Sequence, residues 1–364
     1  MKVGILTFHR ALNYGAVLQC YALQETVKRL GYEVDVLDYQ PKYIEKYRQI
    51  YSSYSISHRK GIKNKIKEVL VRTLLARKVI KARDAFNSFL SEHLNIVRYK
   101  SLDEWNNNYD IIIIGSDQVW SPTIGDGFDK IFWGCFPHDK MRLLSYAASI
   151  GGHNVIDDAM WYDICDLVRN FDKVSVREDW FSRQLSDKIK REVTTVLDPT
   201  LLVNRRIYEN IQKEPEFNNY LLLFLIVEDN YALRFAKEIA QEKGLSIVRI
   251  KALQEFEKRD KTVVDLFSIS PQAFLGYFAR AAFVVTNSFH GTAFSLIYRR
   301  NFYSLDSPRI DRAKSLLHSI NLENRIVSSK DTGVYSIIDY SNINQRIEGL
   351  QEASFKYLLS SLSD

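Results

Sequence analysis

The sequence predicts two α/β domains in succession, with a helical insertion in the first. Its 364 residues are enough for two domains of about 150–200 residues each. Short, continuous apolar runs alternate with helical patterns near both ends of the chain, which is typical of parallel sheets covered on both faces. Between residues 42 and 94 the pattern is helical only. We therefore expect a first domain over 1–200, a second over 201–342 and a closing helix over 343–364.

The first domain opens with a strand, a helix and a second strand. A β-rich run covers Lys2–Phe8, and Glu33–Asp38 is the next strand. Between them, apolar residues at spacings of four and three predict a helix with one buried face that ends at Gly31; they are Ala16, Cys20, Leu23, Val27 and Leu30. Further strands are expected at Asp110–Gly115, Leu143–Ala147, Lys173–Val176 and Thr194–Leu197.

The insertion concentrates the positive charge of the chain. From Lys42 to Arg83 there are 13 Lys and Arg against two acidic residues, a local balance of +11, so that the rest of a chain of net charge +6 carries −5. An apolar stripe predicts an amphipathic helix with a basic face over residues 62–83; it consists of Ile62, Ile66, Val69, Leu70, Thr73, Leu74 and Ile80. The stripe packs on the domain, or the helix docks on anionic lipid headgroups, and the two interpretations are compatible.

The second domain repeats the alternation of strands and helices. Strands are expected at Leu221–Val227, Leu245–Ile250, Ala282–Thr286 and near Phe302–Leu305. Helices are expected over Tyr231–Lys243, where Gly244 ends the helix, over Pro271–Arg280, from about Gly291, and over Ile343–Leu362.

Composition and motifs exclude several classes of protein. The longest apolar run, Tyr220–Val227, is far shorter than the ~20 residues of a membrane-spanning helix. Three cysteines without a C-x-x-C pair predict neither a disulfide framework nor a zinc site, and there is no leader pattern at the N-terminus. Dinucleotide-binding, Walker and nucleophile-elbow motifs are absent from the sequence. A local basic island on an acidic body does not predict nucleic-acid binding. We expect a cytoplasmic protein without a metal ion.

Polar clusters follow four of the predicted strands. They are His9 with Asn13 after the first strand, Ser116-Asp117-Gln118, Arg177, and Asn287-Ser288-Phe289-His290-Gly291. Ligands of open parallel sheets gather beyond the carboxyl ends of strands, where helix N-termini point their amides. Because the clusters are divided between two domains, we expect a cleft between the domains.

Each cluster has a functional and a structural interpretation. A helix N-terminus disfavours a charged imidazole and a bound anion reverses that preference, so His290 is a candidate proton donor to an anionic substrate; the alternative is a capping or packing histidine. Arg177 is an anion clamp or forms a surface ion pair with Glu178 or Asp179. Asp117 is a site residue or a helix cap, and Asn13 is a site residue or shapes a turn.

Five strings, in this order and spacing, resemble the polysaccharide pyruvyl transferase family. They are Gly4-Ile-Leu-Thr-Phe-His9 with Asn13-Tyr-Gly-Ala-Val-Leu-Gln19, Ile111–Ser116-Asp117-Gln118-Val-Trp120, Ser175-Val-Arg-Glu178, Leu197-Asp-Pro-Thr-Leu-Leu202 and Thr286-Asn-Ser-Phe-His-Gly291. The resemblance implies transfer of a pyruvyl group from phosphoenolpyruvate to a sugar as a cyclic ketal bridging two hydroxyls. It implies a fold of two Rossmann-like domains facing across a cleft, similar to GT-B glycosyltransferases. Phosphoenolpyruvate is then a co-substrate and no cofactor is expected.

The resemblance also assigns roles to residues. His290 matches the donor-site histidine and becomes the candidate general acid, with Asp117 as candidate base toward a sugar hydroxyl. Arg177, Ser288 and Gly291 fall on the donor side, and His9, Asn13 and Gln118 on the acceptor side. The acceptor is expected to be a glycan or a lipid-linked saccharide, which places the protein at the inner face of the membrane.

One departure from the family pattern concerns the donor site. Several members have Arg-Leu-His where this chain has Ser288-Phe289-His290, so a cation is missing. Arg309, Arg312 or Lys314 could replace it, and Arg312 is preferred because Arg312-Ala-Lys-Ser-Leu-Leu317 resembles the family's basic residue ahead of a Leu-Leu pair. The rival functions are a GT-B glycosyltransferase using a nucleotide sugar and a non-catalytic glycan- or anion-binding relative. The oligomeric state is not predicted.

Overall fold

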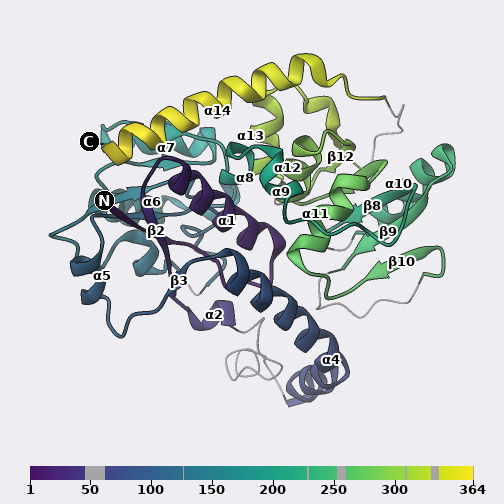
Figure 1. The fold of residues 1–364 in the computed structure, drawn as a ribbon, viewed down its shortest axis with the longest axis horizontal. Coiled ribbons are helices and arrows are strands. Elements are labelled where there is room, and N and C mark those ends of the chain that lie inside the picture. The colour runs from purple at the N-terminus through teal and green to yellow at the C-terminus, as the bar shows by residue number, and fades with distance from the viewer. Residues whose placement is uncertain are drawn as a thin grey trace. The chain divides into compact units, whose positions relative to one another are not determined.

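A computed structural model of the chain contains two compact units, each built on a parallel β-sheet (Figure 1). It describes residues 1–45, 62–125, 127–227, 229–251, 260–307, 310–328 and 336–363, with side chains for all of these except 45, 62–75 and 154. Unit 1 comprises residues 1–72, 87–203 and 348–364, and unit 2 comprises residues 73–86 and 204–347. The predicted α/β class with two Rossmann-like domains is confirmed.

The sheet of unit 1 has the strand order β3-β2-β1-β4-β5, and every pairing is parallel. The strands are β1 (Lys2–Leu6), β2 (Glu33–Leu37), β3 (Ile96–Val97), β4 (Ile111–Ile114) and β5 (Arg142–Ser145). A parallel pair, β6 (Ser175–Val176) and β7 (Thr194–Thr195), continues it, because single bridges join Leu144 to Lys173 and Ala148 to Val176. β4 is buried on both faces, which accounts for its run of four isoleucines.

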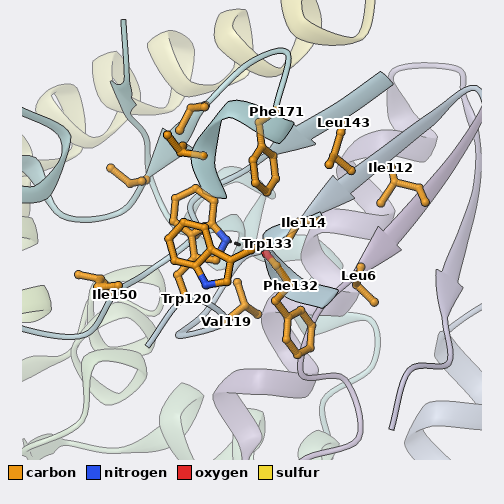
Figure 2. Close-up of a cluster of buried hydrophobic side chains, with 14 of the residues drawn as sticks. Leu6, Ile112, Ile114, Val119, Trp120, Phe132, Trp133, Leu143, Ile150 and Phe171 are labelled. Atoms are coloured by element: carbon orange, nitrogen blue, oxygen red, sulfur yellow. Dashed lines mark hydrogen bonds between the residues drawn. The ribbon is translucent and has the colours of Figure 1, made fainter. Parts of the chain in front are cut away.

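An aromatic cluster forms the core on one side of this sheet (Figure 2). The rings of Trp120 and Trp133 are stacked, with centroids 4.3 Å apart and planes 11° apart. Trp120 donates its indole N–H to the carbonyl of Phe132 at 2.8 Å, so the buried polar atom is satisfied. These contacts fix the loop that follows β4, from which Asp117 and Gln118 come.

The sheet of unit 2 has the order β10-β9-β8-β11-β12-β13 and is also parallel. Its strands are β8 (Tyr220–Phe224), β9 (Ser246–Ile250), β10 (Val263–Leu266), β11 (Phe283–Thr286), β12 (Asn301–Leu305) and β13 (Ile326–Val327). Helix α10 (Asn230–Lys243) packs Phe235 against Tyr303 of β12, and helix α11 (Pro271–Arg280) packs Phe274 against Phe224 of β8. Ile239 and Val285 belong to the core beneath α10.

Helices occupy the connections between the strands. The α-helices are α1 (Tyr14–Arg29), α2 (Lys42–Glu45), α4 (Ile62–His93), α5 (Asp103–Asn108), α6 (Asp158–Leu167), α7 (Asp179–Ile189), α8 (Pro199–Leu202), α9 (Arg205–Glu209), α10 (Asn230–Lys243), α11 (Pro271–Arg280), α12 (Phe289–Ile297), α13 (Asp311–Ser319) and α14 (Tyr340–Ser363). Short 3-10 helices are η1 (Lys130–Trp133), η2 (His153–Val155), η3 (Val168–Asn170) and η4 (Glu323–Arg325). Within the described ranges, no helix combines the length and the apolar character that crossing a bilayer requires.

Two long helices contribute to both units. Residues 73–86 of α4 belong to unit 2, as do residues 340–347 of α14, which Figure 1 shows as one unbroken yellow helix. The predicted insertion at 42–94 is helical over α2 and α4, and its residues 46–61 lie outside the described part. Most of the predicted apolar stripe also lies where side chains are not described. The closing helix begins at Tyr340, three residues before the predicted Ile343.

Several strands are shorter than predicted, and three are additional. The strand predicted over Leu221–Val227 ends at Phe224, because the Asn287 side chain bonds the backbone of Ile226 and Val227 in place of a neighbouring strand. The first strand ends at Leu6 because the chain turns there. The backbone N–H of His9 donates to the carbonyl of Thr7 at 2.9 Å, within the turn itself. β3, β10 and β13 were not predicted.

Candidate functional site

The first candidate site lies where the strand order of unit 1 changes direction. The chain passes from β1 to β2 and β3 on one side of the sheet, while β4 and β5 extend the other side. Ligands of open parallel sheets bind beyond the strand ends at such a switch point. Here Thr7 donates from Oγ1 to the backbone carbonyl of Ser116 at 2.8 Å, and Gln19 of α1 donates to Thr7 Oγ1 at 2.9 Å. The ends of β1 and β4 are therefore fixed to each other and to α1.

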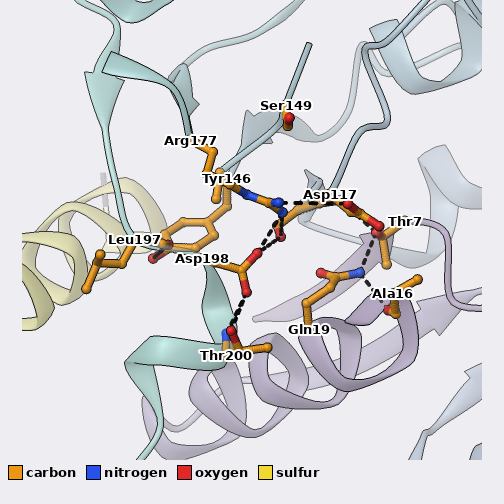
Figure 3. Close-up of polar contacts among 12 residues, drawn as sticks. Thr7, Ala16, Gln19, Asp117, Tyr146, Ser149, Arg177, Leu197, Asp198 and Thr200 are labelled. Carbon is orange, nitrogen blue, oxygen red and sulfur yellow. Dashed lines mark hydrogen bonds and ion pairs between the residues drawn. The ribbon is translucent and has the colours of Figure 1, made fainter. Parts of the chain in front are cut away.

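A buried cluster of charged side chains lies beside this point (Figure 3). Arg177 Nη2 lies 2.6 Å from Asp198 Oδ2 and donates to Ser116 Oγ at 2.9 Å. Ser116 Oγ donates to the same Asp198 oxygen at 3.0 Å. The second terminal nitrogen, Nη1, lies 3.8 Å from Asp117 Oδ1. The sequence left two interpretations open for Arg177, an anion clamp and a surface ion pair with Glu178 or Asp179. The structure shows an ion pair, but this pair is buried and the partner is Asp198.

Asp198 is held from both of its oxygens. It is the N-terminal cap of α8, where Oδ1 accepts the backbone N–H of Thr200 at 2.9 Å and the Thr200 hydroxyl at 2.6 Å. The Asp-Pro sequence favours this geometry, because Pro199 occupies the first helical position, where no amide hydrogen is needed. The bonds to Thr200 therefore fix the Asp198 carboxylate independently of its pairing with Arg177.

Asp117, Gln118 and Asn13 come from the loops around the switch point. Asp117 has a backbone φ of 72°, the left-handed region that aspartate tolerates better than most residues, and its carbonyl accepts the N–H of Ser149 at 2.9 Å. The amide of Gln118 lies against Gly151, where an added Cβ would be 2.8 Å from Gln118 Nε2. Asn13 is exposed and caps α1 through Ala16 N at 3.3 Å. The structural role of Asn13 is therefore a helix cap, where the sequence predicted a turn residue as the alternative to a site residue. Its acceptor role stays a prediction.

His9 is fully buried and paired. Its Nε2 lies 3.1 Å from Asp38 Oδ1, and its Nδ1 lies 3.1 Å from the carbonyl of Thr7. Arg10 donates to both oxygens of Asp38, at 2.6 and 2.9 Å. Burial acts to raise the pKa of Asp38, but hydrogen bonds from His9 and Arg10 outweigh it and hold that pKa well below its ordinary value. Asp38 thus holds His9 and Arg10 at the end of β2. A contact between His9 and the acceptor therefore requires the acceptor to lie beside the His9–Asp38 pair.

The second candidate site lies at the corresponding switch point of unit 2, between β8 and β11. Asn287 accepts the N–H of Ile226 and donates to the carbonyl of Val227, both at 2.7 Å. Thr286 donates to the carbonyl of Phe224 at 2.7 Å, and Ser288 N–H donates to Thr286 Oγ1 at 3.0 Å. The N-terminus of α12 is thereby fixed at the carboxyl edge of the sheet, in the geometry that favours anions.

Two of the predicted donor-site residues are brought together by Phe289. The ring of His290 contacts the Phe289 ring edge-on, at 5.2 Å between centroids, and the guanidinium carbon of Arg312 lies 5.6 Å from the Phe289 centroid. His290 and Arg312 are both 5% exposed. Arg312, in the first turn of α13, is thus a buried cation that contacts Phe289, the residue directly after Ser288. Lys314 is half exposed and pairs with Asp306 at 3.0 Å, and Arg309 lies outside the described residues.

Gly291 and Ser288 have structural consequences at the start of α12. A Cβ on Gly291 would lie 2.2 Å from Thr286 Oγ1, so only glycine permits this close approach of helix and strand. Ser288 is the cap residue of α12 and makes no side-chain capping hydrogen bond. Its carbonyl accepts the Thr292 hydroxyl at 3.2 Å.

Buried charge is distributed unequally between the two units. Among the described residues, the four acidic residues that are buried as whole residues all belong to unit 1: Asp35, Asp117, Glu178 and Asp198. The side chain of Asp38, in the same unit, is only 3% exposed. Four of the five buried Arg and Lys belong to unit 2: Arg249, Lys251, Arg312 and Arg325. Arg249 is paired with the half-buried Asp265 at 2.7 Å. Among the described residues, buried cations are therefore concentrated in unit 2 and buried acidic residues in unit 1.

Sequence reasoning missed two acidic residues of the first site. Asp198 and Asp38 were not predicted as site residues, although each directly follows or closes a predicted strand. The Asp-Pro pair at 198–199 signalled a helix cap, but nothing local indicated that its second oxygen would bind Arg177. No group of three His, Cys, Asp or Glu able to hold a metal ion occurs in the part of the chain that the structure describes.

Comparisons with known proteins bear on the fold and on the family. The chain is similar to a UDP-GlcNAc 2-epimerase from Methanocaldococcus jannaschii in complex with UDP-GlcNAc and UDP, at 11% identity and a TM-score of 0.48, covering 100% of this chain and 99% of that one. It is similar to a UDP-GlcNAc 2-epimerase from Neisseria meningitidis bound to UDP-GlcNAc (10% identity, TM-score 0.47, coverage 100% and 99%). It is also similar to a glycosyltransferase from Streptomyces nogalater (8% identity, TM-score 0.41, coverage 100% and 98%).

The sequence itself was compared in two further ways. No curated protein matches the chain. A sequence model of one family, described as polysaccharide pyruvyl transferase, matches residues 13–308, which is most of the chain.

Proposed function

The chain belongs to the polysaccharide pyruvyl transferase family, and from this membership we propose that it transfers the pyruvyl group of phosphoenolpyruvate to two hydroxyls of a sugar. The sugar is part of a cell-surface polysaccharide or of a lipid-linked glycan precursor. The product is a cyclic ketal, and inorganic phosphate is released. No cofactor is required for this chemistry, since the donor already contains the activated enol carbon.

The observation that carries the proposal is the division of buried charge between the units. Phosphoenolpyruvate has about three negative charges near neutral pH and needs fixed cations and amide dipoles. Unit 2 supplies Arg312 at 5% exposure and the N-terminus of α12 at its switch point. We assign the donor to this edge of unit 2, with Ser288 and Gly291 forming the backbone turn beside it. A neutral sugar suits the carboxylates of unit 1.

The reaction balances with one proton donor and one base. His290 gives a proton to the methylene carbon of phosphoenolpyruvate, which leaves a cationic centre at the neighbouring carbon. A sugar hydroxyl attacks this carbon and loses its proton to Asp117, forming the first C–O bond. The C–O bond to phosphate then breaks, and the leaving phosphate takes the proton that Asp117 holds, which restores the Asp117 carboxylate. The second hydroxyl closes the ring, and its proton restores His290.

The acceptor is assigned to the switch point of unit 1. Asp117 and Gln118 come from the loop after β4, and Asn13 lies at the start of α1. Carboxylate and amide groups are the usual partners of sugar hydroxyls. His9 is fully buried, and we assign it to the acceptor side as a residue held in place by its pairing with Asp38.

Calorimetry with phosphoenolpyruvate and with UDP-GlcNAc as separate titrants tests the proposal. We expect binding of phosphoenolpyruvate in the micromolar to millimolar range and release of phosphate when methyl glycosides or a lipid-linked glycan are added. Specific binding of UDP-GlcNAc alone would favour a glycosyltransferase. Tight binding of phosphoenolpyruvate without phosphate release in the presence of both kinds of acceptor would favour a non-catalytic relative.

We further propose that the basic face of α4 contacts anionic lipid, which would hold the protein at the inner face of the membrane beside a lipid-linked acceptor. Among its described side chains, Arg77, Lys78 and Lys81 are exposed. Each basic residue near an anionic surface adds about 1 kcal/mol to binding. Co-sedimentation with phosphatidylglycerol vesicles, compared with phosphatidylcholine vesicles, checks this: equal sedimentation with both would contradict it.

A further inference from the structure

We propose that His153 and Trp180 of unit 1 form a subsite for a second sugar of the acceptor, the ring next to the one that receives the pyruvyl group. The two side chains are stacked, with ring centroids 3.9 Å apart and planes 27° apart. The inference rests on the pyruvyl transfer proposed above. It adds that the acceptor is an oligosaccharide, and that a pyranose ring packs against the exposed side of this stack.

The stack extends the aromatic core of unit 1 to the surface. Trp180 packs on Phe181 with centroids 5.5 Å apart, and Phe181 contacts Trp120 of that core at 6.4 Å. Phe181 is fully buried, Trp180 is half-buried and His153 is exposed. The indole N–H of Trp180 is buried and has no hydrogen-bond acceptor among the described residues, so ring packing positions this side chain. The imidazole of His153 is therefore an exposed ring on a well-packed base.

Both residues lie at the carboxyl edge of the unit 1 sheet. His153 begins η2 in the loop after β5, and Trp180 is in the first turn of α7, which follows β6. Asp117 and Gln118 follow β4 at the same edge. Since ligands of open parallel sheets bind at this edge, the stack lies on the side of the sheet to which the acceptor is assigned.

The loop after β5 brings the stack close to Gln118. The Gln118 amide lies against Gly151, where an added Cβ would be 2.8 Å from Nε2. His153 follows Gly151 by two residues, and two residues of extended chain span at most about 7 Å. Asp117 is joined to the same loop, because its carbonyl accepts the N–H of Ser149 at 2.9 Å. A glycan with one ring at Asp117 and Gln118 can therefore place its neighbouring ring at the stack.

Glu178 fixes this loop to α7. Its Oε1 accepts the hydroxyl of Ser149 and the backbone N–H of Gly151, the latter at 3.4 Å. Glu178 is fully buried and is the cap residue of α7, so one side chain joins the loop of His153 to the helix of Trp180. The stack is thus formed before any ligand binds, and binding there requires little further ordering.

The chemistry of the stack suits a pyranose ring. The faces of such a ring consist of C–H groups, which bury favourably against an aromatic ring, while the hydroxyls at its edge bind polar groups. A nucleobase is the other flat ligand that aromatic side chains bind by stacking. The connection of the stack to Gln118 and Asp117 through one loop favours the sugar, and titration with UDP separates the two ligands.

Paired acceptors test the inference. Phosphate release from phosphoenolpyruvate is measured with the methyl glycosides of lactose, maltose, cellobiose and N,N′-diacetylchitobiose, each compared with the methyl glycosides of its component sugars. For the disaccharide that wild type uses best, kcat/KM should exceed that of the better component sugar by at least about tenfold, mainly through KM. A ratio near or below one for every pair would overturn the inference, while the release of phosphate would leave the proposed function intact.

Substitutions assign this ratio to the stack. His153→Ala and Trp180→Leu should lower the disaccharide-to-monosaccharide ratio of kcat/KM to about one, because the second ring loses its contact. His153→Phe keeps a flat ring and should retain most of the ratio. The control is Tyr162→Ala, an aromatic residue of α6 that is 81% exposed, and its ratio should equal that of wild type. Should Trp180→Leu not fold, the exposed His153 still decides: an unchanged ratio in His153→Ala would overturn the inference.

Two further results separate this inference from the proposed function. If a lipid-linked disaccharide is the only substrate, its KM should rise at least about tenfold in His153→Ala, and an unchanged KM would overturn the inference. Calorimetric binding of UDP that His153→Ala abolishes would also overturn it, since the stack would then bind a nucleobase. If wild type releases no phosphate with any of these acceptors, the proposed pyruvyl transfer fails, and this inference fails with it.

Discussion

Gly291 of α12 lies directly against Thr286 at the end of β11, so close that a Cβ on the glycine would be 2.2 Å from the threonine hydroxyl oxygen. The contact holds the first turn of α12, and with it His290, at the edge of the sheet. Gly291→Ala should force helix and strand apart, costing about 1–3 kcal/mol of stability. Because the shift occurs one residue from His290, phosphoenolpyruvate affinity should fall as well. Calorimetric unfolding and donor titration measure both effects.

A second glycine provides the control for this substitution. Gly349 lies in α14, and a Cβ there would meet nothing within 4 Å. Gly349→Ala should therefore stabilise the helix by about 0.5–1 kcal/mol and leave donor affinity unchanged. If Gly291→Ala behaved in the same way as Gly349→Ala, the close contact with Thr286 would not be what fixes α12.

Arg312 is predicted to supply the donor-site cation that this chain lacks at position 288. Its guanidinium lies over Phe289 at 5.6 Å, next to the start of α12, and the residue is 5% exposed. Arg312→Gln should weaken phosphoenolpyruvate binding by about 10–100-fold, because a desolvated charge contact is lost. Isothermal calorimetry at a single low ionic strength gives the comparison.

Lys314 discriminates between the candidate cations of α13. It is half exposed and pairs with Asp306, so its charge is largely screened. Lys314→Gln should change donor affinity by less than about twofold. An equal loss in Lys314→Gln and Arg312→Gln would mean that long-range charge, and not a specific contact of Arg312, binds the donor.

The pairing of Asp38 with His9 and Arg10 should make stability depend on pH in the acidic range. The pKa of Asp38 is lowered on folding, so its contribution is complete above the unfolded-state value of about 3.9 and is lost as the pH falls through the folded-state value. Asp38→Asn should cost about 3 kcal/mol at neutral pH, because two partners then face an amide. The difference in Tm between wild type and variant should shrink steadily below about pH 4.

An exposed aspartate of the same unit controls for the change of net charge. Asp163 lies on α6 and is exposed. Asp163→Asn should shift Tm by little at any pH, since surface substitutions usually stay within about 0.5 kcal/mol. A constant difference in Tm between wild type and Asp38→Asn from pH 7 to pH 3 would contradict the ionic role of Asp38.

The central strands could be predicted from the sequence because burial on both faces selects continuous apolar runs. Ile111–Ile114 and Phe283–Thr286 show this plainly, and both lie inside their sheets. β10 was missed because it is an edge strand, where Val264 is 37% exposed and Asp265 breaks the apolar pattern to pair with Arg249. Strand ends were overestimated where side chains such as Asn287 replace the sheet as hydrogen-bond partner.

Only those features of the candidate site that depend on residues close together in the sequence could be predicted. The position of His290 follows from a buried strand, a polar turn and a glycine, and these are neighbours in the chain. The partner of Arg177 is not a neighbour: the sequence suggested Glu178 or Asp179, and the structure pairs it with Asp198, beyond the whole of α7 and β7. Which carboxylate reaches a guanidinium depends on the arrangement of strands, which no local pattern encodes.

The general-acid role of His290 predicts that its substitution lowers kcat much more than it lowers the affinity for phosphoenolpyruvate. A residue that donates a proton in the transition state affects turnover more than ground-state binding. His290→Gln keeps a polar side chain on the first turn of α12, beside Phe289, and should leave phosphoenolpyruvate affinity within about threefold of wild type. Its kcat for phosphate release should fall by about 100- to 10,000-fold, the range typical of a lost general acid.

The two measurements together separate catalysis from binding. Arg312→Gln provides the opposite pattern, since it should raise the dissociation constant of phosphoenolpyruvate more than it lowers kcat at saturating donor. The product is checked by transfer of deuterium from solvent: in D2O the methyl group of the ketal should carry one deuterium, because protonation of the methylene carbon is the step assigned to His290. If His290→Gln lost donor affinity in proportion to activity while its residual kcat stayed near that of wild type, His290 would be a donor-binding residue, and the proton would have to come from another group at the start of α12.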